Sequence, residues 1–276
     1  MKRNVNVFGL AVAGVFVVSR IASAQFATSV LAYERGTGFA SSFTNANAAL
    51  GAPASSSSVT PFAPPFSTSQ LVSIGTGGYL TLQLGTPIRD DPSHPFGIDF
   101  LLFGNSFFVS TNGSGASATT SGAIFSSSVS THVEVSQDGS AWFTLDPTLA
   151  PTVGTYYPTD GPGNPLLAVN PVLGTSDFVG TNLSGIRALY AGSAGGADYD
   201  LGWARDGSGN PVSLDSVSYV RIDVLSGRTQ LDAIAVVPEP GVCTLGAVGL
   251  GLYRWRKNPD RVRVRSFRRG IGLTRS

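Results

Sequence analysis

The sequence has little of several residue types on which cross-links and enzyme sites depend. Its 276 residues include one cysteine, Cys243, and two histidines, His94 and His132. A single cysteine excludes a disulfide within the chain, so the fold must be stable without one. No Gly-x-Ser-x-Gly or His-Glu-x-x-His pattern occurs. The sequence therefore gives no sign of a serine-hydrolase elbow or of a zinc-protease helix.

Basic residues are also scarce in the central part of the chain, although the formal net charge is +1. Between residues 26 and 237 the basic residues are Arg35, Arg89, Arg187, Arg205, Arg221 and Arg228. Acidic residues are spread from Glu34 to Glu239, so this part of the chain is distinctly acidic. A nucleic-acid-binding domain needs a basic face of its own, which argues against nucleic acid as a partner.

The first 24 residues have the three parts of a secretory signal peptide. Lys2 and Arg3 precede an apolar run from Val5 to Val18, and Ala22-Ser23-Ala24 supplies small residues for cleavage before Gln25. The alternative is an uncleaved anchor, but a run of about 14 residues is shorter than the roughly 20 that span a bilayer. We therefore expect residues 1–24 to be a signal helix that directs export through the Sec pathway.

The other end has a proline-rich motif, an apolar segment and a basic cluster, in that order. The motif is Val237, Pro238, Glu239 and Pro240, and the apolar segment runs from Val242 to Tyr253. The basic cluster contains Arg254, Arg256 and Lys257. This arrangement resembles the PEP-CTERM sorting signal over about the last 40 residues. The resemblance implies an exosortase-type membrane protease as partner, with processing near Pro-Glu-Pro.

Elementary physics is compatible with a sorting tail over residues 238–276. The prolines end any preceding strand, and the basic cluster favours the cytoplasmic side of a membrane. The apolar segment has about 12 residues, so as a helix it covers roughly 18 Å of a hydrocarbon core of about 30 Å. The tail is therefore expected to hold the protein at the cell envelope or surface at least transiently, through an apolar helix.

The body, residues 26–237, has the composition of an all-β domain because it is poor in lysine and glutamate and rich in glycine, serine, threonine and phenylalanine. Leu80, Leu82 and Leu84 alternate with polar residues as in a half-buried strand. The other strands that we expect are Ser29–Tyr33, Phe96–Phe103, His132–Ser136, Trp142–Leu145, Ala188–Tyr190, Ala197–Trp203, Val217–Val224 and Leu231–Val237. About eight strands favour a two-sheet sandwich with long loops.

The remaining segments predict turns, loops and one short helix. Asp138-Gly139 is a hairpin turn, and Ser110–Ser130 is expected to be a low-complexity loop. Only Asn45–Leu50 has helical character.

Several pieces of the body together resemble extracellular sandwich domains of the discoidin-like or galactose-binding-like class. These pieces are Ser73-Ile74-Gly75, Gly78–Leu82, Gly97–Phe103, Val133–Ser136 with Asp138-Gly139 and Trp142, Gly195–Leu201, Tyr219–Ile222 and Leu231–Ile234. The resemblance implies a jelly-roll sandwich, often with a structural calcium ion, and in some members loops that bind sugars. It offers no catalytic residue.

Acidic residues at expected strand ends are candidate calcium ligands, because calcium takes six to eight oxygen ligands. Asp99, Asp200 and Asp232 are the preferred candidates, since apolar neighbours make an unpaired charge costly, and Asp91 and Asn105 come next. The alternative is that these acids cap turns or accept bonds from backbone amides. No Asp-x-Asp-x-Asp-Gly loop is present to favour calcium.

Aromatic residues in the expected loops are candidates for stacking on sugar rings. They are Tyr156, Tyr157, Tyr199 and Trp203. The sequence thus predicts a non-enzymatic, exported surface or extracellular-matrix protein. A carbohydrate-binding module, with extracellular polysaccharide as partner, is the alternative, and a secreted glycoside hydrolase is third. A binding module requires aromatic residues that converge on one loop face, whereas a hydrolase requires two acids about 5 to 10 Å apart across a cleft.

Overall fold

The computed structural model describes residues 25–113, 115–125, 128–154 and 157–239. One sheet has six strands: β1 (Ala27–Glu34), β3 (Tyr79–Arg89), β7 (Ser130–Ser136), β8 (Phe143–Leu145), β10 (Ala204–Arg205) and β11 (Ser216–Ser226), in the order β1-β3-β11-β7-β8-β10. The second has four strands: β2 (Val72–Gly75), β4 (Phe100–Gly104), β9 (Ala197–Tyr199) and β12 (Arg228–Val236), in the order β2-β12-β4-β9. All neighbouring strands in both sheets are antiparallel.

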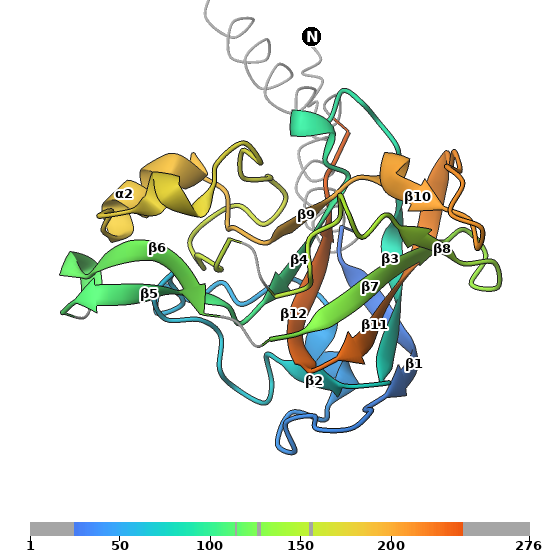
Figure 1. Cartoon of the computed structure of the whole chain (residues 1–276), viewed down its shortest axis with the longest axis horizontal. Coiled ribbons are helices and arrows are strands. Elements are labelled where there is room, and N and C mark those ends of the chain that lie inside the picture. The colour runs from blue at the N-terminus through green and yellow to red at the C-terminus, as the bar shows by residue number, and fades with distance from the viewer. Residues whose placement is uncertain (1–24, 114, 126–127, 155–156, 240–276) are drawn as a thin grey trace, which may run out of the picture. The chain divides into compact units, whose positions relative to one another are not determined.

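A separate hairpin and several short helices complete the described chain (Figure 1). The hairpin is formed by β5 (Phe107–Asn112) and β6 (Thr119–Phe125), and the α-helix is α2 (Leu183–Tyr190). The 3-10 helices are η1 (Ala46–Ala49), η2 (Pro95–Gly97), η3 (Gly115–Ser117), η4 (Thr175–Phe178) and η5 (Leu201–Trp203). The described part of the chain is therefore mostly antiparallel β, in agreement with the all-β sandwich expected from the sequence.

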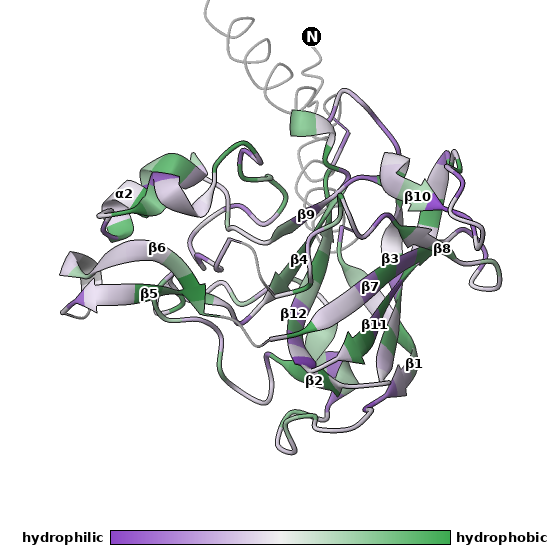
Figure 2. Cartoon of the chain, viewed as in Figure 1, coloured by the Kyte–Doolittle hydropathy of each residue, from purple (hydrophilic) through white to green (hydrophobic). Residues whose placement is uncertain are grey.

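The main core lies between the six-stranded and the four-stranded sheet. Leu80 and Leu82 of β3 pack in the same buried cluster as Ile222 of β11, Phe100 of β4 and Ile234 of β12. Polar residues alternate with these positions along β3 and β11 because successive side chains of a strand point to opposite faces. Figure 2 shows the resulting hydrophobic character of β4 and β11.

The four-stranded sheet is buried on both faces. Phe100 and Leu102 face the main core, whereas Leu101 and Phe103 belong to a second buried cluster with Ala233 and Ala235 of β12. Ala168 and Ala194, from the long segment between β8 and β9, cover this second face. Continuous burial explains why this strand has a run of apolar residues where β3 has an alternating pattern.

The hairpin β5–β6 packs against α2 through a third cluster, to which Phe108, Ile186 and Tyr190 contribute (Figure 1). The side chain of Asn182 caps α2 by accepting a hydrogen bond from the Gly185 amide, 3.0 Å away. Arg187 donates two hydrogen bonds of 2.8 Å to the buried carboxylate of Asp160. This bidentate pair connects the helix to the segment that covers the four-stranded sheet.

Four local predictions were wrong in whole or in part. The strand expected over Ala197–Trp203 ends at Tyr199, and Leu201–Trp203 forms η5 instead. Ala188–Tyr190 was expected to be a strand but ends α2, because Ile186 and Tyr190 lie four residues apart on its buried face. Ser110–Ser130 was expected to be a loop, yet it contains the end of β5 and all of β6. The strand expected from Phe96 begins only at Phe100, since Phe96 and Gly97 have left-handed φ angles of 63° and 70°.

Predictions for the two ends fall mostly outside the described residues. The signal helix over residues 1–24 and the tail residues Pro240, Arg254, Arg256 and Lys257 all lie there. Within the described ranges, no helix has the length and hydropathy needed to cross a membrane.

Candidate functional site

Immediately before β4 lies a buried carboxylate with several hydrogen-bond donors around it. Asp99 is 0% exposed. Its Oδ1 lies 2.8 Å from Nδ1 of His94 and accepts a 3.3 Å bond from the Asp91 amide, and its Oδ2 accepts a 2.8 Å bond from the Leu201 amide. Burial raises the pKa of Asp99 to about 6, and the hydrogen bonds from Leu201 and His94 oppose that rise. Asp99 thus connects η2, the start of η5 and the turn after β3.

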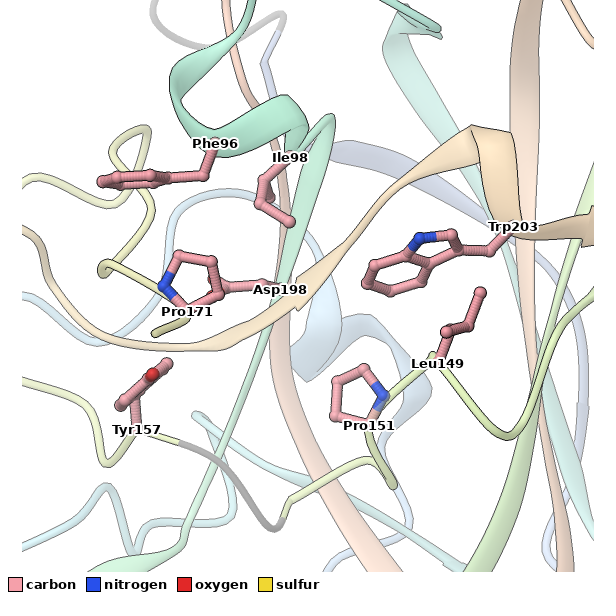
Figure 3. A pocket seen from close by; sticks show the side chains of 8 residues that line it. All are labelled: Phe96, Ile98, Leu149, Pro151, Tyr157, Pro171, Asp198 and Trp203. Atoms are coloured by element: carbon pink, nitrogen blue, oxygen red, sulfur yellow. The ribbon is translucent and has the colours of Figure 1, made fainter. Parts of the chain in front are cut away.

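Beside this carboxylate lies a pocket of about 230 Å³ on the outer side of the four-stranded sheet. Its lining residues are Phe96, Ile98, Leu149, Pro151, Tyr157, Pro171, Asp198 and Trp203. Figure 3 shows Trp203 on one side and Phe96 and Tyr157 on the other, with Asp198 between them. Aromatic and apolar walls around a single polar group are typical of small-ligand sites.

Strand β9 places Asp198 in this pocket. Asp198 pairs with Leu101 of β4, so its side chain points to the outer face, while its neighbours Ala197 and Tyr199 point to the main core. The side chain is buried, and its Oδ1 has no hydrogen-bond partner. Burial raises the pKa of Asp198 to about 8. A buried acceptor without a partner is costly, which makes this oxygen a candidate contact for a ligand hydroxyl.

The two aromatic side chains at the mouth of the pocket are positioned by local backbone features. Trp203 is the last residue of η5. Asp200 is the N-cap of this helix, and its Oδ1 accepts a 2.7 Å hydrogen bond from the Gly202 amide. Phe96 is 54% exposed and has a φ of 63°. A left-handed phenylalanine costs on the order of 1 kcal/mol and occurs where the surrounding structure fixes it.

The four predicted sugar-stacking residues have different environments. Trp203 and Tyr157 both line the pocket, but Tyr157 is 3% exposed, because its hydroxyl donates to the carbonyls of Asn170 and Leu173 and its ring packs in the third buried cluster. Tyr199 is fully buried and stacked on Phe100 at 5.1 Å, so the prediction that it contacts a sugar was wrong. Tyr156 lies outside the described residues.

The predicted calcium ligands separate into different places. Asp99 and Asp200 come together with Asp90, with one oxygen of each within 4.8 Å of the others. Asp91 lies instead beside His94 and Glu239 at the same spacing.

The other two predicted ligands are near neither group. Asp232 is next to a register shift in β12, and its Oδ2 accepts a 2.8 Å bond from the Ala54 amide. Asn105 donates to Gln230. Among the described residues, no group of aspartate, glutamate, histidine and cysteine side chains that could hold a metal ion includes Asp232, so a calcium site that uses Asp99, Asp200 and Asp232 together was a wrong prediction. Calcium at Asp99 and Asp200 stays a prediction, and the structure adds Asp90 as the third carboxylate of that group.

Sequence reasoning missed His94 and Phe96 as site residues, and it did not predict that Asp198 lines a pocket. His94 is buried, and its Nδ1 lies 2.8 Å from Asp99 Oδ1. The segment from Asp91 to Asp99 contains two prolines, a histidine and a glycine, a composition that indicates a sharply turned segment in which side chains close in sequence meet. For Asp198 the sequence gives a weaker indication of a site, namely its position in the expected strand next to the double glycine Gly195-Gly196.

Comparison with models of known protein families finds none that matches this chain. Comparison with curated proteins also finds no match. The function therefore has to be inferred from the sequence features and the geometry above.

The buried carboxyl group of Asp232 makes stability depend on pH. Burial raises its pKa from 3.8 to about 7, so between these values the folded protein holds a proton that the unfolded chain has released. The free energy of unfolding therefore falls as pH rises through this range. Asp232→Asn removes this contribution, and we expect the loss of stability between pH 5 and pH 8 to be smaller than in the wild type by about 2 kcal/mol.

Urea unfolding at the two pH values measures this difference. Asp215→Asn, which changes an exposed carboxyl group, is the matched control and should lose stability in parallel with the wild type. A parallel loss in Asp232→Asn as well would contradict the assignment.

Proposed function

We propose that this chain is an exported, non-enzymatic protein of the cell surface, and that its β-sandwich binds a neutral saccharide in the pocket between Trp203 and Phe96. The convergence of three aromatic rings on one pocket with the buried Asp198 carboxyl group is the observation that carries the proposal. Aromatic faces stack on the apolar faces of sugar rings, and a carboxyl group bonds to their hydroxyls. The jelly-roll form of the sandwich belongs to the same proposal.

The number of acidic residues that line the pocket favours saccharide binding over hydrolysis. Among its described lining residues, Asp198 is the single acidic one. Glycoside hydrolysis by the usual route needs a second carboxyl group across the cleft, at roughly 5 to 10 Å. A single carboxyl group is enough for hydrogen bonding to a ligand, so we favour the binding module over the glycoside hydrolase.

The size of the site suits a short oligosaccharide. A second hollow, of about 370 Å³, shares Tyr157 and Pro171 with the first and is lined in addition by Leu173 and Phe178. Two adjoining hollows with shared walls can accept neighbouring units of one chain. Extracellular polysaccharide is therefore the partner class that we propose.

The cellular part of the proposal is supported by the sequence of the two ends. Export follows from the signal-peptide pattern of residues 1–24, and sorting by an exosortase-type protease follows from the Pro-Glu-Pro, apolar and basic pattern of residues 238–276. In the described chain the Val237 amide donates to the Asp99 carbonyl at 2.9 Å, so the domain is held in place up to the motif itself.

Saccharide binding is tested with a panel of neutral oligosaccharides from bacterial exopolysaccharides, by calorimetric titration of the protein. We expect Trp203→Ala and Phe96→Ala each to weaken binding at least tenfold, which corresponds to about 1.4 kcal/mol per variant. The matched control is Phe66→Ala, because Phe66 is 73% exposed and does not line the pocket. Failure of the panel to bind, or binding that survives both pocket variants, would contradict the proposal.

Export and sorting are tested by intact mass of the mature protein from fractionated native cells. The proposal predicts a species that begins at about Gln25 and ends close to Pro240. A species that retains Arg254–Ser276 would argue against processing of the tail.

A further inference from the structure

A histidine and two carboxyl groups meet where the chain leaves β12, next to the saccharide pocket and separate from it. One nitrogen of His94 and one carboxylate oxygen each of Asp91 and Glu239 all lie within 4.8 Å of one another. Asp91 and His94 come from the turn before η2, and Glu239 comes from the segment after β12. None of them lines the pocket described above.

His94 has one nitrogen in use and one nitrogen free. Its side chain is 1% exposed, and its Nδ1 lies 2.8 Å from the buried carboxylate of Asp99. Its Nε2 is buried and has no hydrogen-bond partner. Because Asp99 orients the ring and favours a proton on Nδ1, Nε2 is left with a lone pair. Histidine ligands of metal ions typically have this arrangement, in which a carboxylate holds the nitrogen that does not bind the metal.

The two carboxyl groups also need something between them. One carboxylate oxygen of Asp91 and one of Glu239 lie within 4.8 Å of each other. Two carboxylates this close repel each other, and a cation between them removes the repulsion. Arg89 pairs with Glu239 at 3.9 Å, and both partners of that ion pair are exposed.

We propose that His94, Asp91 and Glu239 form a zinc site, with His94 Nε2 and one oxygen from each carboxylate as ligands and Asp99 as the positioning residue. Zinc binds imidazole nitrogen and carboxylate oxygen, and three protein ligands leave its fourth position to water. Calcium and magnesium prefer oxygen ligands alone, so the buried imidazole nitrogen selects against them. This inference does not depend on saccharide binding.

Because Glu239 is one of its ligands, the zinc site includes a residue of the sorting motif. Glu239 is the middle residue of Pro238-Glu239-Pro240. A zinc ion bound there holds the last described residues of the domain against the turn between β3 and β4. With zinc bound, the glutamate of the motif is a metal ligand and is not free to contact another protein.

The test uses the full chain in detergent with Cys243→Ser as background, since a thiolate would also bind zinc. Zinc chloride is added in a metal-buffered solution, and bound metal is measured by elemental analysis and by competition with a chromophoric chelator. We expect one zinc per chain, at least tenfold weaker binding in Asp91→Asn and in Glu239→Gln, and no displacement by excess calcium chloride. The carboxylate variants change partly exposed residues and should fold.

The two histidines provide a matched pair of variants. His94→Gln should abolish zinc binding, whereas His132→Gln should leave it unchanged, because His132 is on β7 and lies in neither group of possible ligands. Absence of stoichiometric zinc, binding that survives both carboxylate variants, loss of binding in His132→Gln, or displacement by calcium would each overturn the proposal.

Discussion

One end of the sandwich is organised around the buried carboxyl group of Asp99. Taking a carboxylate out of water costs several kcal/mol unless hydrogen bonds replace those to the solvent. Three segments supply these bonds, through the His94 imidazole and the amides of Asp91 and Leu201. Removing any one of them would leave part of the charge without a partner. The carboxylate therefore fixes the relative positions of the β3–β4 turn, β4 and η5.

These segments also contribute residues to both candidate sites, to which β9 adds Asp198 and the segment after β12 adds Glu239. The turn presents Phe96 to the pocket on one side and Asp91 to Glu239 on the other. The segment after β9, which begins with Asp200, brings Trp203 to the same pocket. The aromatic wall and the carboxylate–histidine group are thus held by one set of hydrogen bonds, and a ligand in either site meets a framework that is already in position.

The four-stranded sheet explains why such a framework is present at this end. Its outer face carries Leu101 and Phe103, which must be covered, and the long segment between β8 and β9 covers them. Asp198 points to this outer face, and the cover leaves its Oδ1 atom buried without a partner. The pocket is therefore the place where the covering segment does not close over the sheet.

Patterns of period two predicted most of the strands, because alternation along β3, β7 and β11 follows directly from having one face in the core. The hairpin turn at Asp138-Gly139 was also predictable from the sequence, since Gly139 has a φ of 77° that glycine adopts without cost. The hairpin β5–β6 was not, because its serine and threonine residues resemble a loop. Its apolar partners in α2 lie more than 50 residues away in the sequence, where no local pattern can connect them.

The candidate sites were predictable only in part, for a similar reason. The sequence identified Trp203, Tyr157, Asp91, Asp99 and Asp200 by residue type, but it could not assign them to sites. Asp232 resembled Asp99 in its apolar context, and only the pairing of β12 with β4 places it at the other end of the strands. Tyr199 differed from Asp198 by one position, which is enough to put it on the opposite face of β9.

The most direct test of this account is the protonation of the His94 ring, observed by long-range proton–nitrogen NMR with His132→Gln to assign the two histidines. The account predicts a proton on Nδ1, slow to exchange because Asp99 holds it, and an unprotonated Nε2 whose resonance shifts when zinc chloride is added. A neutral ring with its proton on Nε2, unchanged by zinc, would contradict it.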